Sequence, residues 1–163
     1  MLSIGNKIEN KPLESWDWNV GMRILDTDHF SEFIKGSDSA AGRRLAMRLM
    51  ESGEVFVTTI ITYEEQLRGW LAKIHKNRDV TWQQNDYSDL RRVLDSFQYW
   101  EVFDWSTEAA ERFHQFRSDG VHISSMDLKI ACLTLEYDAV LLTSNAKDFS
   151  KVPGLSFEDW LHE

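Results

Sequence analysis

The sequence predicts an α/β fold with a mostly parallel central sheet. Short apolar or β-branched runs alternate with longer segments in which apolar residues recur every three or four positions. Strands separated by helices pair in parallel, because a helical crossover brings the chain back to the same end of the sheet. The length of 163 residues suits one domain with a substantial core, and 42% hydrophobic with 28% charged residues is typical of a globular protein.

Five runs have the composition of strands. Residues 55–60 are rich in β-branched side chains, which fit the pleated surface of a buried strand, whereas residues 101–105 are weaker because two acids interrupt them. The expected strands are MRIL at 22–25, VFVTTI at 55–60, EVFDW at 101–105, AVLLTS at 139–144 and a short one in LSFEDW at 155–160.

Six segments have helical periodicity. The strongest covers residues 62–76, where apolar side chains occupy positions i, i+3, i+4 and i+7 from Leu67. In residues 39–51 the apolar positions alternate with three arginines, which predicts an amphipathic helix. The expected helices cover residues 29–35, 39–51, 62–76, 82–99, 107–117 and 125–137.

Residues 1–21 differ from the rest of the chain, because they have neither helical nor strand periodicity and contain one of the two prolines. We expect an N-terminal extension there, or an over-long assignment of the start codon, ahead of a single domain at residues 22–163. No segment resembles a signal peptide, and no apolar run is long enough to span a membrane. Cys132 is the single cysteine and is expected in the core, so the sequence predicts a cytoplasmic protein without an internal disulfide.

The net charge of −9 and the pI near 5.0 argue against a general, charge-driven nucleic-acid binder. Residues 66–78 nevertheless carry Arg68, Lys73 and Lys76 without any acid between them. This basic stretch is a candidate surface for phosphate contacts. The alternative is an ordinary solvated helix face, because lysines at these spacings are common.

Acidic residues follow the predicted strands. Asp26 comes directly after residues 22–25, Glu65 falls in the first turn of the helix that follows residues 55–60, and Asp148 comes just after residues 139–144. In parallel α/β sheets, ligands bind beyond the carboxyl ends of the strands. A fourth acid, Asp127, begins the helix that leads into the strand at 139–144, so we expect the four carboxylates to meet at one edge of the sheet.

Each acid also has a purely structural alternative as part of a turn or a helix cap. Thr62 and Glu65, like Ser124 and Asp127, have the spacing of a capping box, in which the acid bonds the first amides of its own helix. Asp28 has the position of a helix N-cap.

A cluster of carboxylates suits a hard divalent cation. Mg²⁺ needs only one or two carboxylates together with water and substrate phosphate. Such an ion activates water against a phosphodiester and stabilises the leaving oxygen. This chemistry gives a reason to gather acids in spite of their mutual repulsion.

The same residues are similar to the motifs of the PIN-domain ribonucleases of the VapC toxin type. RILDTDHFSEF resembles the opening strand and the LDT-[ND]-x-x-S motif of that family, with Asp26 as its first acid. TTIITYEEQLRGW resembles a T-x-x-E-L-x-x-G block, which Thr62, Glu65 and Gly69 match by spacing. SSMDLKIACLTLEYDAVLLTSNAKDFSKVPGL resembles the third block, with Asp127 as the third acid.

The fourth position departs from the family pattern. The family often places Asp or Asn two residues after the threonine that ends the strand, and here that residue is Asn145. Asp148 follows three residues later, so either side chain is a candidate for this place. The resemblance extends from residue 22 to about residue 160, and residues 1–21 match nothing in the family.

The resemblance implies a PIN-like three-layer α/β/α sandwich, a homodimer, Mg²⁺ or Mn²⁺ as cofactor, and endonucleolytic cleavage of RNA. It implies the toxin of a type II toxin–antitoxin pair, whose cognate antitoxin often inserts a basic side chain into the acidic pocket. Asp26 and Asp127 would hold the metal, and Glu65 would hold metal or water. Asn145 or Asp148 would complete the site. Arg68, Lys73 and Lys76 are candidate substrate contacts on the basis of the basic stretch alone, not of the resemblance.

Three other interpretations are compatible with parts of the sequence. A strand followed by Asp-Thr-Asp also begins the haloacid-dehalogenase-type phosphatases, but only 19 residues follow Thr143-Ser144, too few for the remaining parts of that site. A non-enzymatic α/β binding module would use its acids only as helix caps. A catalytically weak or inactive PIN-type module would bind nucleic acid without cleaving it. His29, beside the acids, is expected in a turn or packing role, with metal or phosphate contact as the alternative.

Overall fold

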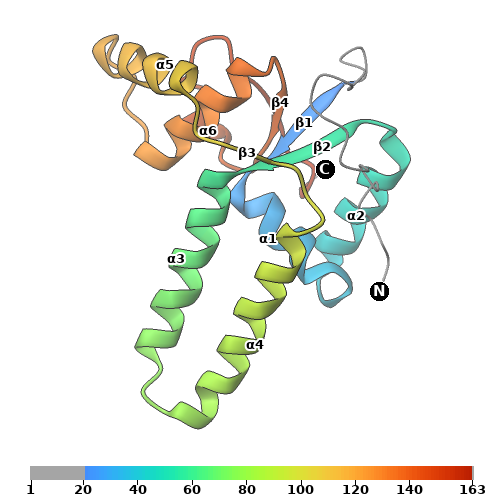
Figure 1. Ribbon diagram of the computed structural model, residues 1–163. Coiled ribbons are helices and arrows are strands. Elements are labelled where there is room, and N and C mark those ends of the chain that lie inside the picture. The colour runs from blue at the N-terminus through green and yellow to red at the C-terminus, as the bar shows by residue number, and fades with distance from the viewer. Residues whose placement is uncertain (1–20, 163) are drawn as a thin grey trace.

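A computed structural model describes residues 21–162, so the extension expected at residues 1–21 lies outside the described residues apart from Gly21. Five strands form one sheet in the order β3-β2-β1-β4-β5, and every pairing between neighbours is parallel. The expected parallel sheet is therefore confirmed (Figure 1). The strands are β1 (Met22–Leu25), β2 (Val55–Thr59), β3 (Val102–Phe103), β4 (Val140–Leu142) and β5 (Ser156–Glu158).

All six expected helices are present, with small shifts at their ends. Two short elements were not expected, the 3₁₀ turn η2 and the single-turn helix α7, because segments of three or four residues are too short to show a period. The helical elements are α1 (Thr27–Lys35), η2 (Gly36–Asp38), α2 (Ala40–Ser52), α3 (Ile60–Lys76), α4 (Val80–Phe97), α5 (Thr107–Ser118), α6 (Ser125–Glu136) and α7 (Ala146–Phe149).

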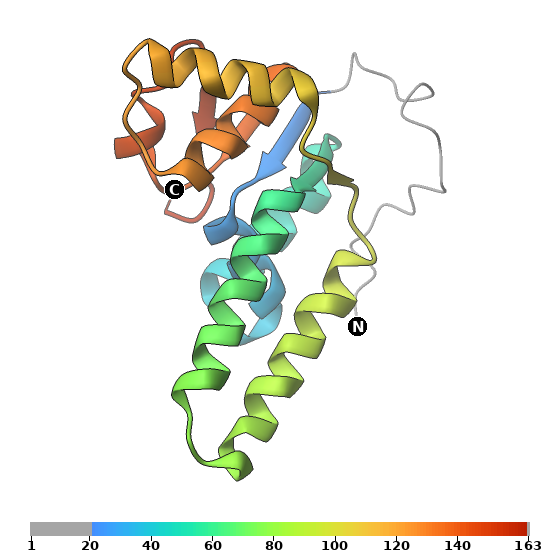
Figure 2. The same cartoon turned by 60° about the vertical axis from the view of Figure 1, so that its left-hand side comes forward.

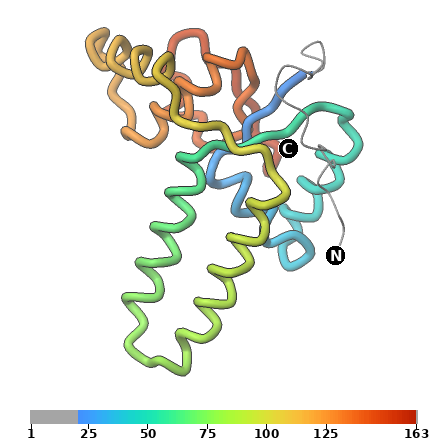
Figure 3. Tube along the Cα trace, viewed as in Figure 1, coloured from blue at the N-terminus to red at the C-terminus, as the bar shows by residue number. Residues whose placement is uncertain are grey.

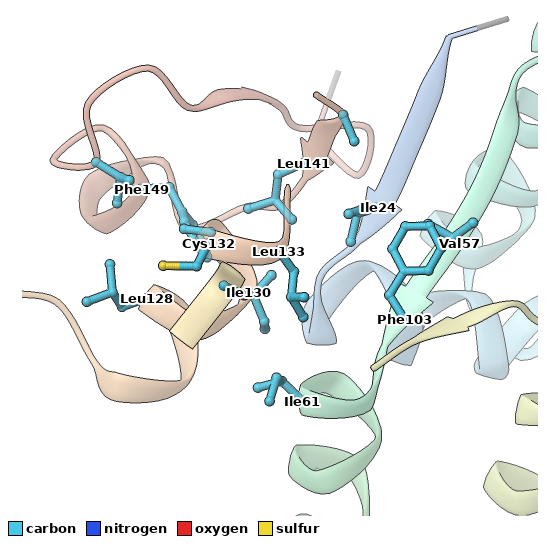
Figure 4. Close-up of a cluster of buried hydrophobic side chains, with 14 of the residues drawn as sticks. Ile24, Val57, Ile61, Phe103, Leu128, Ile130, Cys132, Leu133, Leu141 and Phe149 are labelled. Carbon is cyan, nitrogen blue, oxygen red and sulfur yellow. The ribbon is translucent and has the colours of Figure 1, made fainter. Parts of the chain in front are cut away.

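One face of the sheet is covered mainly by α5 and α6. Ile24 of β1 and Leu141 of β4 point into this layer, where they pack with Leu128 and Leu133 of α6 (Figure 4). Cys132 lies in the same cluster, as expected, and burial raises the pKa of its thiol to about 12.

The opposite face of the sheet is covered by α1, α2 and α4. Leu25 and Leu142 directly follow the two strand residues that face the first layer, so they point the other way, as side chains alternate along a strand. They pack with Phe30 of α1, Leu45 of α2 and Phe97 of α4. The three layers confirm the expected α/β/α sandwich, and apolar residues on both faces account for the nearly continuous hydrophobic strands.

The chain changes direction across the sheet between β1 and β4. From β1 it continues outward through β2 to β3, and it then returns to β4 on the other side of β1 before reaching β5. Such a reversal leaves a crevice at the carboxyl ends of the two strands concerned, where open α/β sheets bind their ligands. The loops that follow Leu25 and Leu142 therefore frame the place where a site is expected.

Helices α3 and α4 form an antiparallel hairpin that extends away from the carboxyl edge of the sheet (Figures 2 and 3). Asp86 of α4 is buried between the two helices, where Lys73 of α3 lies 2.9 Å from its carboxylate and Asn77 donates a hydrogen bond to it. No helix among residues 21–162 is both long enough and apolar enough to cross a membrane.

Gly21 already belongs to the sheet, because its carbonyl oxygen accepts a hydrogen bond of 3.0 Å from the Val55 amide. A truncation that removes the expected extension should therefore keep Gly21.

We predict that Gly42→Ala destabilises the protein, because a Cβ at Gly42 would lie 2.4 Å from the carbonyl oxygen of Glu32 and 2.8 Å from that of Gly36. Alanine favours a helix over glycine by about 1 kcal/mol, but overpacking against a fixed backbone costs roughly 1–3 kcal/mol, so the net effect is a loss. Urea unfolding measures it. Gly69→Ala in α3 is the matched control, and it should gain up to about 1 kcal/mol. A Cβ at Gly69 would meet no atom of residues 21–162 within 4 Å, apart from its chain neighbours and the nearby backbone of its own helix. Equal stability of the Gly42 variant and wild type would contradict the close helix contact.

Candidate functional site

Asp26 lies at the junction of β1 and β4. Its backbone amide donates to the carbonyl of Leu142, and its side chain is only 5% exposed. One carboxylate oxygen accepts a 2.7 Å hydrogen bond from the Thr143 hydroxyl, and the other accepts one of 2.7 Å from the Thr27 amide. Asp26 is therefore both the N-cap of α1 and a carboxylate held across the ends of the two central strands.

Asp28 is not the N-cap that the sequence suggested, because Asp26 takes that place. Its carboxylate reaches across to the loop after β4 and accepts a 2.7 Å hydrogen bond from the Ser144 amide. A local sequence pattern shows only that an acid is near a helix start, and it cannot show a partner 116 residues away.

Glu65 faces α1 from the second turn of α3, not from the first turn as expected. The helix begins at Ile60, and the Thr59 hydroxyl accepts from the Thr62 amide, so the capping box considered as an alternative role for Thr62 and Glu65 is wrong. The Glu65 carboxylate instead accepts a hydrogen bond from the hydroxyl of Thr27.

Gln66 fastens α3 to α1 next to this contact. Its buried side-chain amide donates to the hydroxyl of Ser31 at 2.6 Å and to the carbonyl of Thr27 at 3.3 Å. The two bonds fix the rotation of α3, so that the preceding residue, Glu65, faces Thr27. Neither Thr27 nor Gln66 was singled out from the sequence, because a long-range polar contact leaves no periodic signal.

Asp127 lies in the first turn of α6, where the Ser124 hydroxyl accepts from its amide at 3.0 Å. This is one of the two bonds of the expected capping box. The Asn145 side chain lies between two carboxylates, 3.4 Å from Asp127 and 3.3 Å from Asp148. Both candidates for the fourth position therefore stand beside Asp127, and Asp148 is also paired with Lys151 at 2.5 Å.

The carboxylates influence one another's protonation. Burial, followed by the negative charge of Asp28, raises the pKa of Asp26 to about 7, and Asp127 adds to this effect. The pKa of Glu65 is raised by burial and also by the charge of Asp127. Burial, with the charges of Asp148 and Asp28, raises the pKa of Asp127.

Asp148 differs from the other three acids, because the Lys151 ammonium holds the pKa of its carboxyl below the usual range. Its negative charge is thus already offset by a protein cation. Within residues 21–162, Arg68 lowers the pKa of Glu65 without reversing the net rise, and no cation contributes to the pKa shift of Asp26 or Asp127.

The donor set suits a hard divalent cation, since it consists of carboxylate and amide oxygens from four chain segments. Within residues 21–162, no three His, Cys, Asp or Glu side chains are close enough to hold a metal ion in their described positions. Asp26 and Glu65 are instead turned toward threonine hydroxyls. Burial, together with repulsion from other acids, raises the pKa values of both carboxylates, and a bound cation would offset both effects.

A cleft of about 570 Å³ begins at Thr27 and Glu65 and continues between α1, α3 and α4. Of the basic residues expected to contact substrate, only Lys73 lines it, where its ammonium lies 4.4 Å from the centre of the Trp70 ring. Arg68 is exposed and pairs with Glu64 one turn earlier, and Lys76 is exposed near the end of α3. The cleft is also lined by Ser31, Ile34, Lys35, Gln66, Gly69, Asp89, Arg92 and Val93.

A family model described as PIN domain matches residues 23–155, a range that contains every acid of the site. The chain belongs to the PIN domain family. This PIN domain is 41% identical over 44 residues to ribonuclease VapC1 of Haemophilus influenzae strain R2866, covering 27% of this chain and 33% of that protein. It is 31% identical over 64 residues to ribonuclease VapC2 of Rickettsia felis, covering 37% of this chain and 48% of the relative. The matches thus span about a third to a half of these curated relatives.

The PIN domain also has the fold of solved toxin–antitoxin structures. It superposes on a chain of the DNA-bound VapBC crystal structure from Salmonella typhimurium with a TM-score of 0.67 at 23% sequence identity. The match covers 86% of this chain and 99% of the other. The family membership confirms the resemblance seen in the three motif blocks, and the superposition confirms the fold.

We predict that Asp26→Asn stabilises the metal-free PIN domain at pH 8. A folded-state pKa of about 7, above the unfolded value near 3.9, means that ionisation destabilises the fold increasingly as pH rises through that range. Asparagine can still accept from the Thr27 amide and donate to Thr143. The gain should be at least about 1 kcal/mol at pH 8 and should shrink toward pH 4, since one pKa unit corresponds to about 1.4 kcal/mol.

Denaturant unfolding in EDTA between pH 4 and pH 8 measures this difference. Glu111→Gln on the exposed side of α5 is the control for loss of one negative charge, and it should show no comparable pH-dependent gain. If Asp26→Asn is less stable than wild type at pH 8, the cap role of Asp26 outweighs the repulsion.

Proposed function

We propose that the protein is a metal-dependent endoribonuclease that acts as the toxin of a type II toxin–antitoxin pair. The observation that carries this proposal is the buried carboxylate of Asp26, with a pKa near 7, at the point where the sheet order reverses. The charge of Asp127 raises the pKa of both Asp26 and Glu65, and the Thr27 hydroxyl connects Glu65 to the residue after Asp26. The names of the curated relatives, ribonuclease VapC1 and ribonuclease VapC2, support RNA as the substrate.

In this proposal Asp26, Asp127 and Glu65 hold Mg²⁺ or Mn²⁺, and Asn145 or Asp148 completes the site. A bound cation of this kind supplies a nucleophilic water and stabilises the leaving oxygen of a phosphodiester. Burial raises the pKa of Glu65, which makes its carboxylate a stronger proton acceptor than an ordinary glutamate and a candidate to accept a proton from water. The Thr27 hydroxyl orients that carboxylate, and the Thr143 hydroxyl orients Asp26.

The cleft between α1, α3 and α4 supports the proposal of an antitoxin partner. It opens at Glu65 and mixes apolar side chains, among them Trp70 and Val93, with charged ones. A partner segment in this cleft could direct a basic side chain at the acids, which would neutralise the repulsion that a cation otherwise relieves. The solved structures with this fold include several titled as VapBC or toxin–antitoxin complexes. If the cognate antitoxin is added, RNA cleavage should stop. Unchanged cleavage would contradict this partner.

A homodimer is supported by an apolar stripe on α4. Val80, Tyr87 and Leu94 lie seven residues apart, which places them on one side of the helix, and they are 77%, 55% and 40% exposed. Light scattering that gives about the mass of one 19.1 kDa chain would contradict the dimer. We place the protein in the cytoplasm, where a ribonuclease meets cellular RNA.

We predict that the purified protein cleaves a mixed RNA pool with Mn²⁺ or Mg²⁺, that EDTA stops the cleavage, and that excess metal restores it. Asp127→Asn should lower the rate at least about 100-fold, because even groups that only orient metal ligands contribute roughly 10- to 100-fold. Glu111→Gln removes one negative charge from exposed α5 and should cleave as wild type does.

Cleavage that is equal with and without chelator would overturn the metal-dependent proposal. Binding of RNA without cleavage under any metal would favour the alternative function, a catalytically weak or inactive PIN-type module that only binds nucleic acid.

We predict that Arg68 and Lys76 contribute to RNA affinity through phosphate contacts. In the cleavage-deficient Asp127→Asn background, Arg68→Ala with Lys76→Ala should reduce the slope of log affinity against log salt by about 1.4, or roughly 0.7 per lost contact. Lys73 is kept, because its removal would leave the buried Asp86 without its cation. Arg91→Ala is the matched control, since Arg91 is an exposed arginine that pairs with an acid one turn away, as Arg68 does. An unchanged slope would indicate that Arg68 and Lys76 face solvent or contact the partner protein instead of RNA.

A further inference from the structure

His29 is buried completely in the first turns of α1, next to the acidic site, and the proposed chemistry does not use it. Both of its ring nitrogens have partners. Nδ1 lies 2.8 Å from a carboxylate oxygen of Asp28, and Nε2 lies 3.0 Å from the backbone amide nitrogen of Trp160. An amide N–H can only donate, so Nε2 accepts and Nδ1 carries the proton that it donates to Asp28. The hydrogen bonds thus fix one neutral tautomer and one ring orientation.

The second oxygen of Asp28 holds the loop after β4. It accepts a 2.7 Å hydrogen bond from the amide of Ser144, the middle residue of the segment 143–145. The residues on either side of Ser144 are the ones whose side chains contact site acids, since Thr143 donates to Asp26 and Asn145 donates to Asp127.

A continuous set of hydrogen bonds therefore connects the C-terminal segment to the acidic site. It leads from the Trp160 amide through the His29 ring to Asp28, and from Asp28 to the Ser144 amide. The orientation of Asp28 is fixed because its neighbour His29 is itself fixed at both nitrogens. Other bonds also hold the 143–145 loop, since the Thr143 amide donates to the Glu158 carbonyl and the Ser144 hydroxyl donates to Asp159 at 3.1 Å. Asp28 is the side chain that holds the backbone amide of the middle residue, Ser144.

We propose that Asp28 and His29 are positioning residues, which orient Thr143 and Asn145 so that Asp26 and Asp127 can bind the metal ion. This inference rests on the proposed metal-dependent function. Experiment can distinguish this role from that of an ordinary packed histidine. If His29 only packs, its substitution lowers the stability of the fold. If His29 positions Asp28, its substitution also weakens metal binding by more than the loss of stability explains. The negative charge of Asp28, which also raises the pKa of Asp26, adds to the attraction for a cation.

Two substitutions of His29 test the proposal without changing the net charge. In His29→Asn, the side-chain amide nitrogen takes the place of Nδ1, so the bond to Asp28 is kept and the one from Trp160 is lost. In His29→Gln, the side-chain oxygen takes the place of Nε2, so the bond from Trp160 is kept and the one to Asp28 is lost. The measurements are Mn²⁺ affinity by calorimetry without RNA, melting temperature in EDTA, and the separate values of kcat and KM.

We expect His29→Gln to raise the Kd for Mn²⁺ about 10-fold, at the lower end of what partners of metal ligands contribute, and to lower kcat more than it raises KM. His29→Asn should give a clearly smaller increase in Kd, although both variants lose a buried hydrogen bond and melt at lower temperature. His114→Gln, the same substitution at an exposed position of α5, should bind Mn²⁺ as wild type does.

Equal Mn²⁺ affinity of wild type and His29→Gln overturns the proposal, and so does an equal loss in both His29 variants. If His29→Gln does not fold, Asp28→Ala and Asp28→Asn replace the pair, since the Asp28 side chain is 35% exposed and both changes remove one charge. The asparagine keeps an acceptor for the Ser144 amide, so Asp28→Ala should bind Mn²⁺ more weakly than Asp28→Asn, and equal affinities would overturn the proposal. If the wild-type protein neither binds Mn²⁺ nor cleaves RNA, the proposed function itself fails and this inference fails with it.

Discussion

Asp26 is buried between the ends of β1 and β4, and the surroundings of this carboxylate set the arrangement of the whole site. A buried charge costs free energy unless hydrogen bonds or an opposite charge compensate for it. Here two hydrogen bonds compensate in part, one from the Thr27 amide and one from the Thr143 hydroxyl. The remaining cost keeps the pKa of Asp26 near 7, and a divalent cation is the group that would remove it.

The same hydrogen bonds connect the site to the packing of the fold. Thr27 is the first residue of α1, and its hydroxyl and carbonyl contact Glu65 and Gln66 of α3. The apolar residues that precede and follow these polar ones, Leu25 and Phe30, pack into the layer formed by α1, α2 and α4. Thr27 therefore connects Glu65 and Gln66 of α3 to a helix whose apolar side packs in that layer.

Much of the fold follows from local patterns. Residues 22–25 and 55–60 were predicted as strands from their apolar and β-branched side chains, and residues 62–76 were predicted as a helix from their period. The structure ends the second strand at Thr59 and begins the helix at Ile60. The sequence also placed Asp26 and Asp127 at element ends, because strand ends and helix starts have local signals. It did not show that Thr59 rather than Thr62 caps α3, since two threonines three residues apart offer the same chemistry.

The contacts that could not be predicted are those between distant segments. Lys73 belongs to a stretch without acids along the chain, yet Asp86 and Asp89 of the next helix offset its charge across the hairpin. Asp28 has the local features of a cap but bonds to Ser144, and His29 bonds to the backbone of Trp160. Such pairings depend on the three-dimensional crossing of elements, and a single sequence contains no periodic trace of them.

The hydrogen bond between Thr143 and Asp26 joins residues that are 117 positions apart, which has a consequence for how the protein is made. The ribosome synthesises the chain from the N-terminus, so Asp26 and Glu65 leave the ribosome well before Asp127 and the loop after β4. Pairing of β1 with β4 brings these parts together, and such long-range pairing is slow because the intervening chain must first be ordered. In a growing chain, Asp26 and Glu65 are therefore present before the residues that complete the site. The site forms only when synthesis of the domain is nearly complete.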